Sequence, residues 1–365
     1  MPPPARVSTA NTASPKMHGA STYWGDVVRI DQIVILLGVL SAVTPALAQS
    51  TSAPSNPHQA PCERGLATAC NLLAMDYARG EEGMPKDPAK AVALFAEVCD
   101  AGFGPSCTRL GEMTQGGVGT PKDATKAAGL YEKGCKAGDA DGCIDAGNLV
   151  YAGDGVHKDL AAASNYYALG CEAGSAEGCL NRGNSLWSGI GAAKDPTTAA
   201  DFFGKACQKG RAQGCYQLGI ALETGTGVEK DIESAEMYHN AACDRGFAAG
   251  CTRLGVLEEL NNGGNAKVLA DALSDYRAGC EAKDAEGCLY AGNVYYKGTG
   301  LPAPDFKSAN LYFGLACAAG SGQGCYFRGV TFQQGTGGPK DPAQAAAQFA
   351  KACQLGFAKA CAGAQ

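Results

Sequence analysis

The stretch Cys171-Glu172-Ala173-Gly174-Ser175-Ala176-Glu177-Gly178-Cys179 returns in near copies along the chain. Successive copies begin 36 or 37 residues apart, as in the steps from Cys171 to Cys207 and from Cys243 to Cys280. Such a period indicates stacked structural repeats. The sequence therefore predicts an all-α solenoid, a superhelix of about eight αα-hairpin repeats stapled by disulfides. The pairs use all 18 cysteines: Cys62 with Cys70, Cys99 with Cys107, Cys135 with Cys143, Cys171 with Cys179, Cys207 with Cys215, Cys243 with Cys251, Cys280 with Cys288, Cys317 with Cys325, and Cys353 with Cys361.

The spacing within a pair requires a turn. Eight helical residues rise about 12 Å, whereas bonded cysteines have Cα atoms within about 7 Å of each other. Glycine stands three positions after the first cysteine in every pair except one, where Lys283 takes its place. Glycine there suits a left-handed helix cap, so we expect a more strained turn at Lys283. We predict that each disulfide joins the end of one helix to the start of the next and contributes about 2–3 kcal/mol.

The residues around each pair read as two helices. Before the first cysteine, helix B carries an aspartate N-cap, a small alanine and an aromatic residue, as in Asp195, Ala199 and Phe203. Helix A opens at the second cysteine and spans about eleven residues. A glycine four positions into it, such as Gly183, indicates close approach of a neighbouring helix.

A metal site is the alternative interpretation of the cysteines. Zinc takes four ligands, but His58, His157 and His239 stand in unrelated places, so a site would need thiolates from neighbouring pairs. We favour disulfides, and expect no metal and no cofactor. We interpret His157 as a loop residue and His239 as a surface residue of helix B.

The chain divides into three parts. Residues 1–48 are interpreted as a leader that contains a secretory signal peptide, with an apolar core at 33–43 and a cleavage site after Ala48. An uncleaved anchor and a buried helix are the alternatives. Residues 49–61 read as a flexible linker and 62–365 as the repeat array. The net charge of −6, without a basic cluster, argues against nucleic acid as partner.

The repeat unit resembles a known family. The pattern runs from Leu218-Gly219 through Gly225-Thr226-Gly227-Val228-Glu229-Lys230-Asp231 to Ala235 and Tyr238, and is similar to the Sel-like repeat, a relative of the tetratricopeptide repeat. The paired cysteines resemble the secreted bacterial cysteine-rich branch, the Hcp type. That resemblance implies a binding scaffold, secreted or periplasmic in a bacterial envelope. Some relatives are described as penicillin-binding or weakly β-lactam-hydrolysing. The repeat 251–287 departs from the pattern by losing its Gly-loop and Lys-Asp signature.

Three function classes fit this architecture: a binding scaffold, a β-lactamase-type hydrolase and a structural spacer. The hydrolase would need motifs that supply a nucleophile, its base and an oxyanion site. The nearest strings are Ser274-Asp275-Tyr276 and Lys297-Gly298-Thr299, which look like ordinary helix and loop residues. We name no catalytic residue and favour the scaffold.

Helical geometry indicates where a partner would bind. Residues five and eight positions after the second cysteine share one side of helix A. In three repeats that side combines an asparagine, which can bond a peptide backbone, with an aromatic residue. We predict a peptide, protein or cell-wall glycan such as peptidoglycan on this concave helix A face; the alternative is ordinary polar surface. The predicted residues are Asn148, Tyr151, Asn184, Trp187, Tyr216, Glu223, Asn293 and Tyr296.

Overall fold

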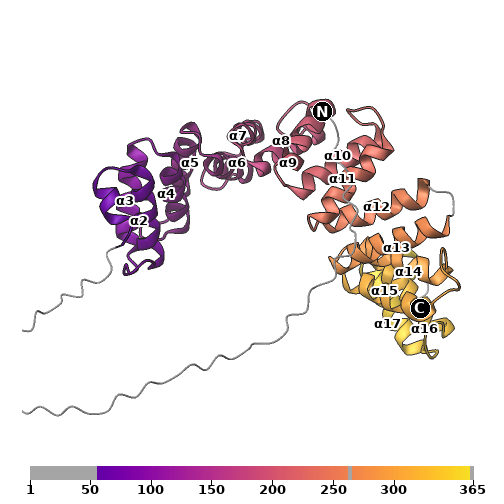
Figure 1. Ribbon diagram of the computed structural model, residues 1–365. Coiled ribbons are helices and arrows are strands. Elements are labelled where there is room, and N and C mark those ends of the chain that lie inside the picture. The colour runs from indigo at the N-terminus through magenta and orange to yellow at the C-terminus, as the bar shows by residue number, and fades with distance from the viewer. Residues whose placement is uncertain (1–55, 262–264, 362–365) are drawn as a thin grey trace, which may run out of the picture. The chain divides into compact units, whose positions relative to one another are not determined.

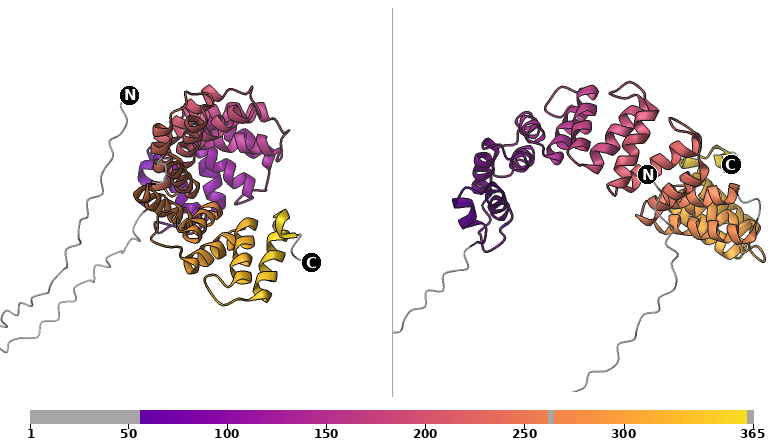
Figure 2. Two further views of the ribbon diagram at one scale, coloured as in Figure 1. Left: turned by 90° about the vertical axis from the view of Figure 1, so that its right-hand side faces the viewer. Right: turned by 45° about the horizontal axis from the view of Figure 1, so that its top comes forward.

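In this computed structural model, the described residues, 56–261 and 265–361, form α-helices and no strand (Figure 1). The leader and residues 49–55 of the expected linker lie outside this part of the chain. Within the described part, each helix packs against its neighbours in sequence, as the further views in Figure 2 show. The predicted all-α array of hairpins is confirmed.

The helices alternate between the two kinds expected. The A helices are α2 (Ala67–Arg79), α4 (Gly104–Gly116), α6 (Ala140–Ala152), α8 (Ala176–Ser188), α10 (Ala212–Thr224), α12 (Ala248–Asn261), α14 (Ala285–Lys297) and α16 (Gly322–Gln334). The B helices are α3 (Pro88–Asp100), α5 (Ala124–Lys136), α7 (Leu160–Glu172), α9 (Pro196–Gln208), α11 (Ile232–Asp244), α13 (Ala266–Glu281), α15 (Phe306–Ala318) and α17 (Pro342–Gln354). The short helices α1 (Gln59–Glu63) and α18 (Ala358–Cys361) flank them.

The start of helix A was predicted wrongly. Helix α8 begins at Ala176, three residues before Cys179, and most A helices have 13 residues, not about eleven. The left-handed Gly174 reverses the chain, and the Ser175 hydroxyl caps α8 by accepting a hydrogen bond from the Gly178 amide (3.1 Å). Because the turn needs only three residues, the second cysteine falls within the first turn of helix A.

The aspartate N-caps of the B helices are confirmed. In seven repeats the carboxylate accepts a hydrogen bond from a backbone amide in the first helical turn; Asp195, for example, accepts from the Thr198 amide at 3.1 Å. A-type helices end at a left-handed glycine, such as Gly225 with φ of 68°. These caps satisfy backbone groups that the helix ends leave without partners.

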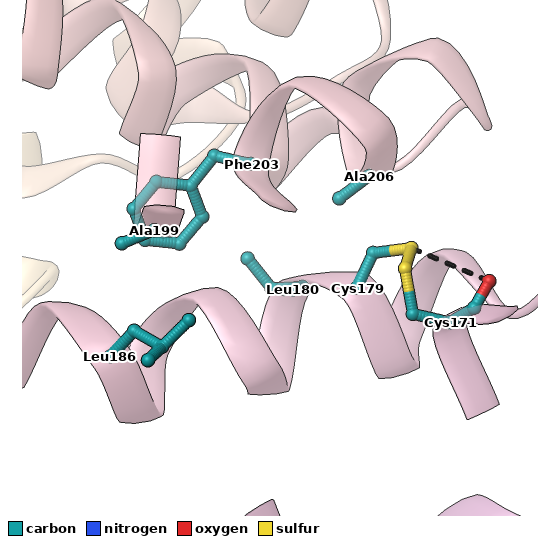
Figure 3. Packing of buried hydrophobic residues seen from close by; sticks show 7 residues of the cluster. All are labelled: Cys171, Cys179, Leu180, Leu186, Ala199, Phe203 and Ala206. Carbon is teal, nitrogen blue, oxygen red and sulfur yellow. Dashed lines mark hydrogen bonds between the residues drawn. A yellow bond between two sulfur atoms is a disulfide. The ribbon is translucent and has the colours of Figure 1, made fainter. Parts of the chain in front are cut away.

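In every hairpin after the first, the core is an aromatic ring packed on a glycine of helix A; in the first, Ala74 takes the place of the glycine. A Cβ added to Gly183 would lie 2.6 Å from Cε1 of Phe203, which is fully buried beside Ala199 and Leu186 (Figure 3). The disulfide between Cys171 and Cys179 closes the same cluster. Only glycine therefore lets this ring approach the backbone of helix A.

All nine expected disulfides lie within their pairs, with Cα atoms 4.4 to 4.8 Å apart. No cysteine is left free, and all 18 belong to the described residues. Asn56, which the sequence assigned to the linker, is buried and donates a hydrogen bond to Asp76 of α2 (2.8 Å). No helix between residues 56 and 361, as far as the structure describes them, is long and apolar enough to cross a membrane.

The hairpin of α12 and α13 differs from the rest. Helix α13 has 16 residues and is capped by Asn265 in place of the usual aspartate. Asp275 of α13 is hydrogen-bonded to Glu258 of α12, and burial raises the pKa of the Asp275 carboxyl well above its usual range. The corresponding positions of the preceding hairpin hold Leu222 and Tyr238. Two carboxyl groups thus stand where another repeat has apolar side chains.

Candidate binding surface

Two adjoining pockets open on the helix A side of α10, α12 and α14. The first, with a volume of about 40 Å³, and the second, of about 130 Å³, share Tyr290 as a common wall. Sites for small molecules and cofactors usually measure about 300–1,000 Å³. Pockets of this size suit individual side chains of a larger partner. The first is lined by Tyr216, Ala249, Thr252, Arg253, Val256, Asp284, Glu286 and Tyr290, and the second by Glu259, Tyr290, Asn293, Val294, Lys297 and Thr299.

The disulfides determine which residues face these pockets. Cys215, Cys251 and Cys288 are at most 3 % exposed, so this edge of each helix points into the core. Tyr216 follows Cys215 by one position, and Arg253 follows Cys251 by two. A step of 100 to 200° around the helix turns both side chains away from the cysteine edge, although the Tyr216 ring still packs against His239 and Phe247, with ring centroids 5.4 and 5.2 Å apart. The same cysteines that staple the repeats therefore also set which side of each A helix faces the pockets.

A salt bridge joins α10 to α12 beside the first pocket. Nε of Arg253 donates to Oε2 of Glu223 at 2.8 Å, and a second guanidinium nitrogen donates to Oε1. Such a two-point contact fixes the plane of the guanidinium. The hydrogen bond to Glu223 also raises the pKa of Arg253. Arg253 therefore lines the pocket in one orientation, with its charge compensated by Glu223.

His239 lies behind this salt bridge and is fully buried, which corrects its assignment to the surface. Its ring sits on Gly219 of α10, in the place that Phe203 takes over Gly183 in the preceding hairpin. Burial lowers the pKa of His239 to about 4, so the imidazole is neutral at pH 7. The sequence did contain the signal, because His239 stands four residues before Cys243, where other repeats have their aromatic residue.

The rim of the first pocket is acidic. Asp284 caps α14 and accepts from the Gly287 amide (3.1 Å) and from the hydroxyl of Thr252 (2.5 Å). Glu286, two residues after Asp284, is exposed and has no hydrogen-bond or ion-pair partner among the residues that the structure describes. The side wall consists of the half-buried rings of Tyr216 and Tyr290. The pocket thus combines aromatic faces with an uncompensated carboxylate.

Three of the eight predicted binding residues belong to this region. Tyr216 lines the first pocket and Asn293 the second, while Glu223 holds Arg253. Tyr296 of α14 lies outside both pockets and donates a hydrogen bond from its hydroxyl to Oε1 of Gln334 (3.2 Å). The sequence prediction missed Arg253, Glu286 and Tyr290, because none of them stands five or eight positions after the second cysteine of its pair.

The other four predicted residues lie on α6 and α8, apart from the pockets. Asn148 and Tyr151 are exposed on α6, and Oδ1 of Asn148 accepts a hydrogen bond from the Tyr167 hydroxyl (2.9 Å). Asn184 is exposed on α8, whereas Trp187 packs against Phe203 with ring centroids 5.9 Å apart. Asn184 thus keeps its amide available, while Asn148 and Trp187 already serve the packing of their own hairpins.

No group of three or more histidine, cysteine, aspartate or glutamate side chains within residues 56–261 and 265–361 could hold a metal ion. Ser274 is exposed on α13 and does not line either pocket, although Lys297 and Thr299 line the second. The two strings that resemble parts of β-lactamase motifs are therefore not gathered around one pocket.

Known proteins give the class of this scaffold. The Sel1 repeat model matches residues 67–103, 104–139, 140–175, 176–210, 212–247, 285–321 and 322–357. The chain belongs to the Sel1 repeat family. The matched segments leave out 248–284, which form the unusual α12–α13 hairpin. No curated protein shows a significant match to the chain.

Two solved structures share the fold, and a third protein is similar over part of the chain. A Sel1 repeat protein from Oxalobacter formigenes is 20% identical, with 84% of this chain and 88% of that chain covered and a TM-score of 0.67. A protective antigen of uropathogenic Escherichia coli with an SLR fold is 24% identical, covering 84% and 73%, with a TM-score of 0.61. Helicobacter pylori cysteine-rich protein B is 30% identical over 38% of this chain and 98% of its own, with a TM-score of 0.31.

Fold and cysteine chemistry together give the general role. Sel1 repeats form a scaffold that generally serves protein interaction. Nine disulfides fit an extracytoplasmic protein, because thiols in the cytosol are kept reduced.

Proposed function

We propose that the protein binds an extended segment of a partner protein along the helix A side of α10, α12 and α14. The observation that carries the proposal is the pair of small pockets that share Tyr290. Alternate side chains of an extended peptide leave the same side of its backbone, about 6.6 Å apart. Two adjoining pockets, divided by one tyrosine ring, suit two such side chains.

Polar groups between the pockets suit the backbone of such a peptide. The amide of Asn293 in the second pocket can both donate and accept hydrogen bonds. Arg253 retains donors that Glu223 does not occupy, since a guanidinium carries five N–H groups. The salt bridge holds these donors in place before the partner arrives, which reduces the entropy lost on binding.

We propose that the surface continues onto α6 and α8 through Asn148 and Asn184, with Tyr151 and Trp187 beside them. Exposure of both asparagines supports this extension. Of the two, Asn184 is the better candidate to bond a partner, because the Tyr167 hydroxyl already donates a hydrogen bond to Oδ1 of Asn148. The proposed setting is the space outside the cytoplasm, secreted or periplasmic, where the leader would deliver a chain with nine disulfides.

A binding screen with the purified mature chain, residues 49–365, tests the proposed function. Selection from an unbiased library of capped decapeptides should yield binders, and Tyr290→Ala should weaken them at least tenfold because it removes the wall of both pockets. Leu169→Ala, which removes an exposed apolar side chain of the B helix α7 that lines neither pocket, is the control and should change affinity less than twofold.

Two results would contradict the proposal. The first is a set of peptide binders that Tyr290→Ala leaves unchanged while its melting temperature stays within a few degrees of wild type. The second is an absence of peptide binders together with co-sedimentation of the chain with insoluble peptidoglycan. That second result would establish the glycan alternative. Hydrolysis of a chromogenic β-lactam, measured in parallel, would support the enzyme alternative.

A further inference from the structure

We propose that the first pocket selects a cationic side chain, lysine or arginine, of the bound segment; this inference rests on the proposed function. Three features of the pocket carry it. They are the charge balance of its rim, the aromatic faces of its wall, and its contrast with the neighbouring pocket.

The rim of the first pocket holds more negative than positive charge. Arg253 is the cation that lines it, and the two hydrogen bonds from Glu223 compensate that charge. Asp284 also lines the rim, and its carboxylate accepts hydrogen bonds from Thr252 and Gly287. The carboxylate of Glu286 has no partner in the part of the chain that the structure describes. A cation is the group that this rim lacks.

The wall of the pocket also favours a cation. Tyr216 and Tyr290 line it from α10 and α14, and each ring face carries partial negative charge. A lysine ammonium or an arginine guanidinium over such a face is attracted to it electrostatically. The volume of about 40 Å³ accepts the head of a cationic chain, whose apolar stem can lie along the tyrosine rings.

The second pocket lacks this charge preference. Glu259 and Lys297 line it with opposite charges, and the Tyr276 hydroxyl donates to Oε2 of Glu259 at 2.7 Å. Val294 supplies an apolar floor. We therefore expect the cationic preference at one position of the peptide, with a neutral or apolar side chain two positions away.

Peptide binders from the decapeptide selection test this inference at 150 mM salt. Lysine or arginine should be enriched at one fixed position, and replacing that residue by norleucine should weaken binding about tenfold. Glu286→Gln should lower affinity for the lysine peptide about tenfold while leaving the norleucine peptide unchanged. Glu286→Lys should instead prefer the same peptide with glutamate in place of lysine.

Glu177→Gln is the matched control. Glu177 stands two residues before Cys179, as Glu286 stands two residues before Cys288, but it belongs to α8 and lines neither pocket. It should leave the preference for lysine intact. Binders that depend on Tyr290 but show no cationic preference would overturn this inference and leave the proposed function standing. Binders insensitive to both Tyr290 and Glu286 would overturn both.

Discussion

Nε2 of His239 lies 3.6 Å from Oε2 of Glu223, and the same carboxylate accepts the hydrogen bonds of Arg253. The neutral imidazole leaves the salt bridge to Arg253 intact at pH 7. A protonated imidazole would be a second cation that competes with Arg253 for the same carboxylate. The hairpin of α10 and α11 has thus exchanged an aromatic ring for a group that acid can charge.

Acid should destabilise the protein through His239. The pKa is lowered from 6.5 to about 4 in the folded state, so between these values the unfolded chain binds more protons than the folded one. The free energy of unfolding therefore rises with pH across this range. The stabilising contribution of neutral His239 is fully present above about pH 6.5 and is lost as the pH falls toward 4. A shift of this size corresponds to about 3 kcal/mol.

Urea unfolding at pH 7 and at pH 4.5 measures this effect. His239→Phe restores the residue type of Phe203 and should remove most of the loss between the two pH values. His157→Phe, which changes the exposed loop histidine, should leave the loss as it is. An equal loss in wild type and His239→Phe would show that carboxyl groups elsewhere cause the acid sensitivity.

Gly183→Ala should destabilise the protein by about 1–3 kcal/mol, the usual cost of overpacking. The added methyl group would lie 2.6 Å from Cε1 of Phe203, which has no room to move in its buried cluster. Gly129→Ala is the control, because Gly129 is exposed on α5 and a Cβ there meets nothing within 4 Å. It should stabilise by about 0.5–1 kcal/mol through helix propensity. Thermal or urea unfolding of both variants measures these changes in stability. An unchanged free energy of unfolding for Gly183→Ala would mean that the two helices can move apart at this contact.

Lys283→Gly should stabilise the protein by about 0.5–1 kcal/mol. Lys283 has a φ of 68°, whereas glycine fills this turn position in the other pairs. A non-glycine residue in the left-handed region destabilises the folded state by about 1–2 kcal/mol. Replacing it by glycine removes this strain, but the greater conformational freedom of glycine in the unfolded chain offsets part of the gain. Lys209→Gly, at a cap residue with φ of −82°, should destabilise instead. A loss of stability in Lys283→Gly, measured by urea unfolding, would show that the lysine makes a compensating contact.

The fold was predictable because each repeat contains several independent signals for the same hairpin, and the signals recur along the chain. Asp195, Ala199, Phe203 and the paired cysteines each point to the same hairpin, and their copies agree along the chain. The start of helix A was predicted too late because the cysteine is the conspicuous residue, whereas Ser175 and Gly174 set the boundary by capping. A short polar cap is easily hidden in a loop-like stretch.

The pockets of the proposed binding surface were only partly predictable from the sequence, for a physical reason. Helical offsets place Tyr216 and Asn293 on the outer side of helix A, and each lines one of the two pockets. Arg253, Glu286 and Tyr290 come from different repeats and meet only when α10, α12 and α14 are packed together. Their pocket depends on differences between repeats, and a pattern search finds what repeats share.

The half-buried carboxyl groups of Asp275 and Glu258 in the unusual hairpin give a last prediction. Burial raises the pKa of Asp275, and the adjacent Glu258, Asp271 and Asp244 raise it further. The folded chain therefore holds a proton that the unfolded chain releases, so this contribution to stability is complete below about pH 4 and is lost as pH rises. Asp275→Asn keeps the shape and removes the charge.

Asp275→Asn should accordingly stabilise the protein at pH 8 by on the order of 1 kcal/mol, after allowance for solvent screening, and have little effect at pH 4. Asp271→Asn, an exposed neighbour on the same helix, should change stability much less at either pH. Urea unfolding of the three proteins at both pH values measures the difference. Equal destabilisation by Asp275→Asn at both values would mean that the carboxyl group of Asp275 is needed for its hydrogen bond, and that charge repulsion in the pair contributes nothing to the stability of the α12–α13 hairpin.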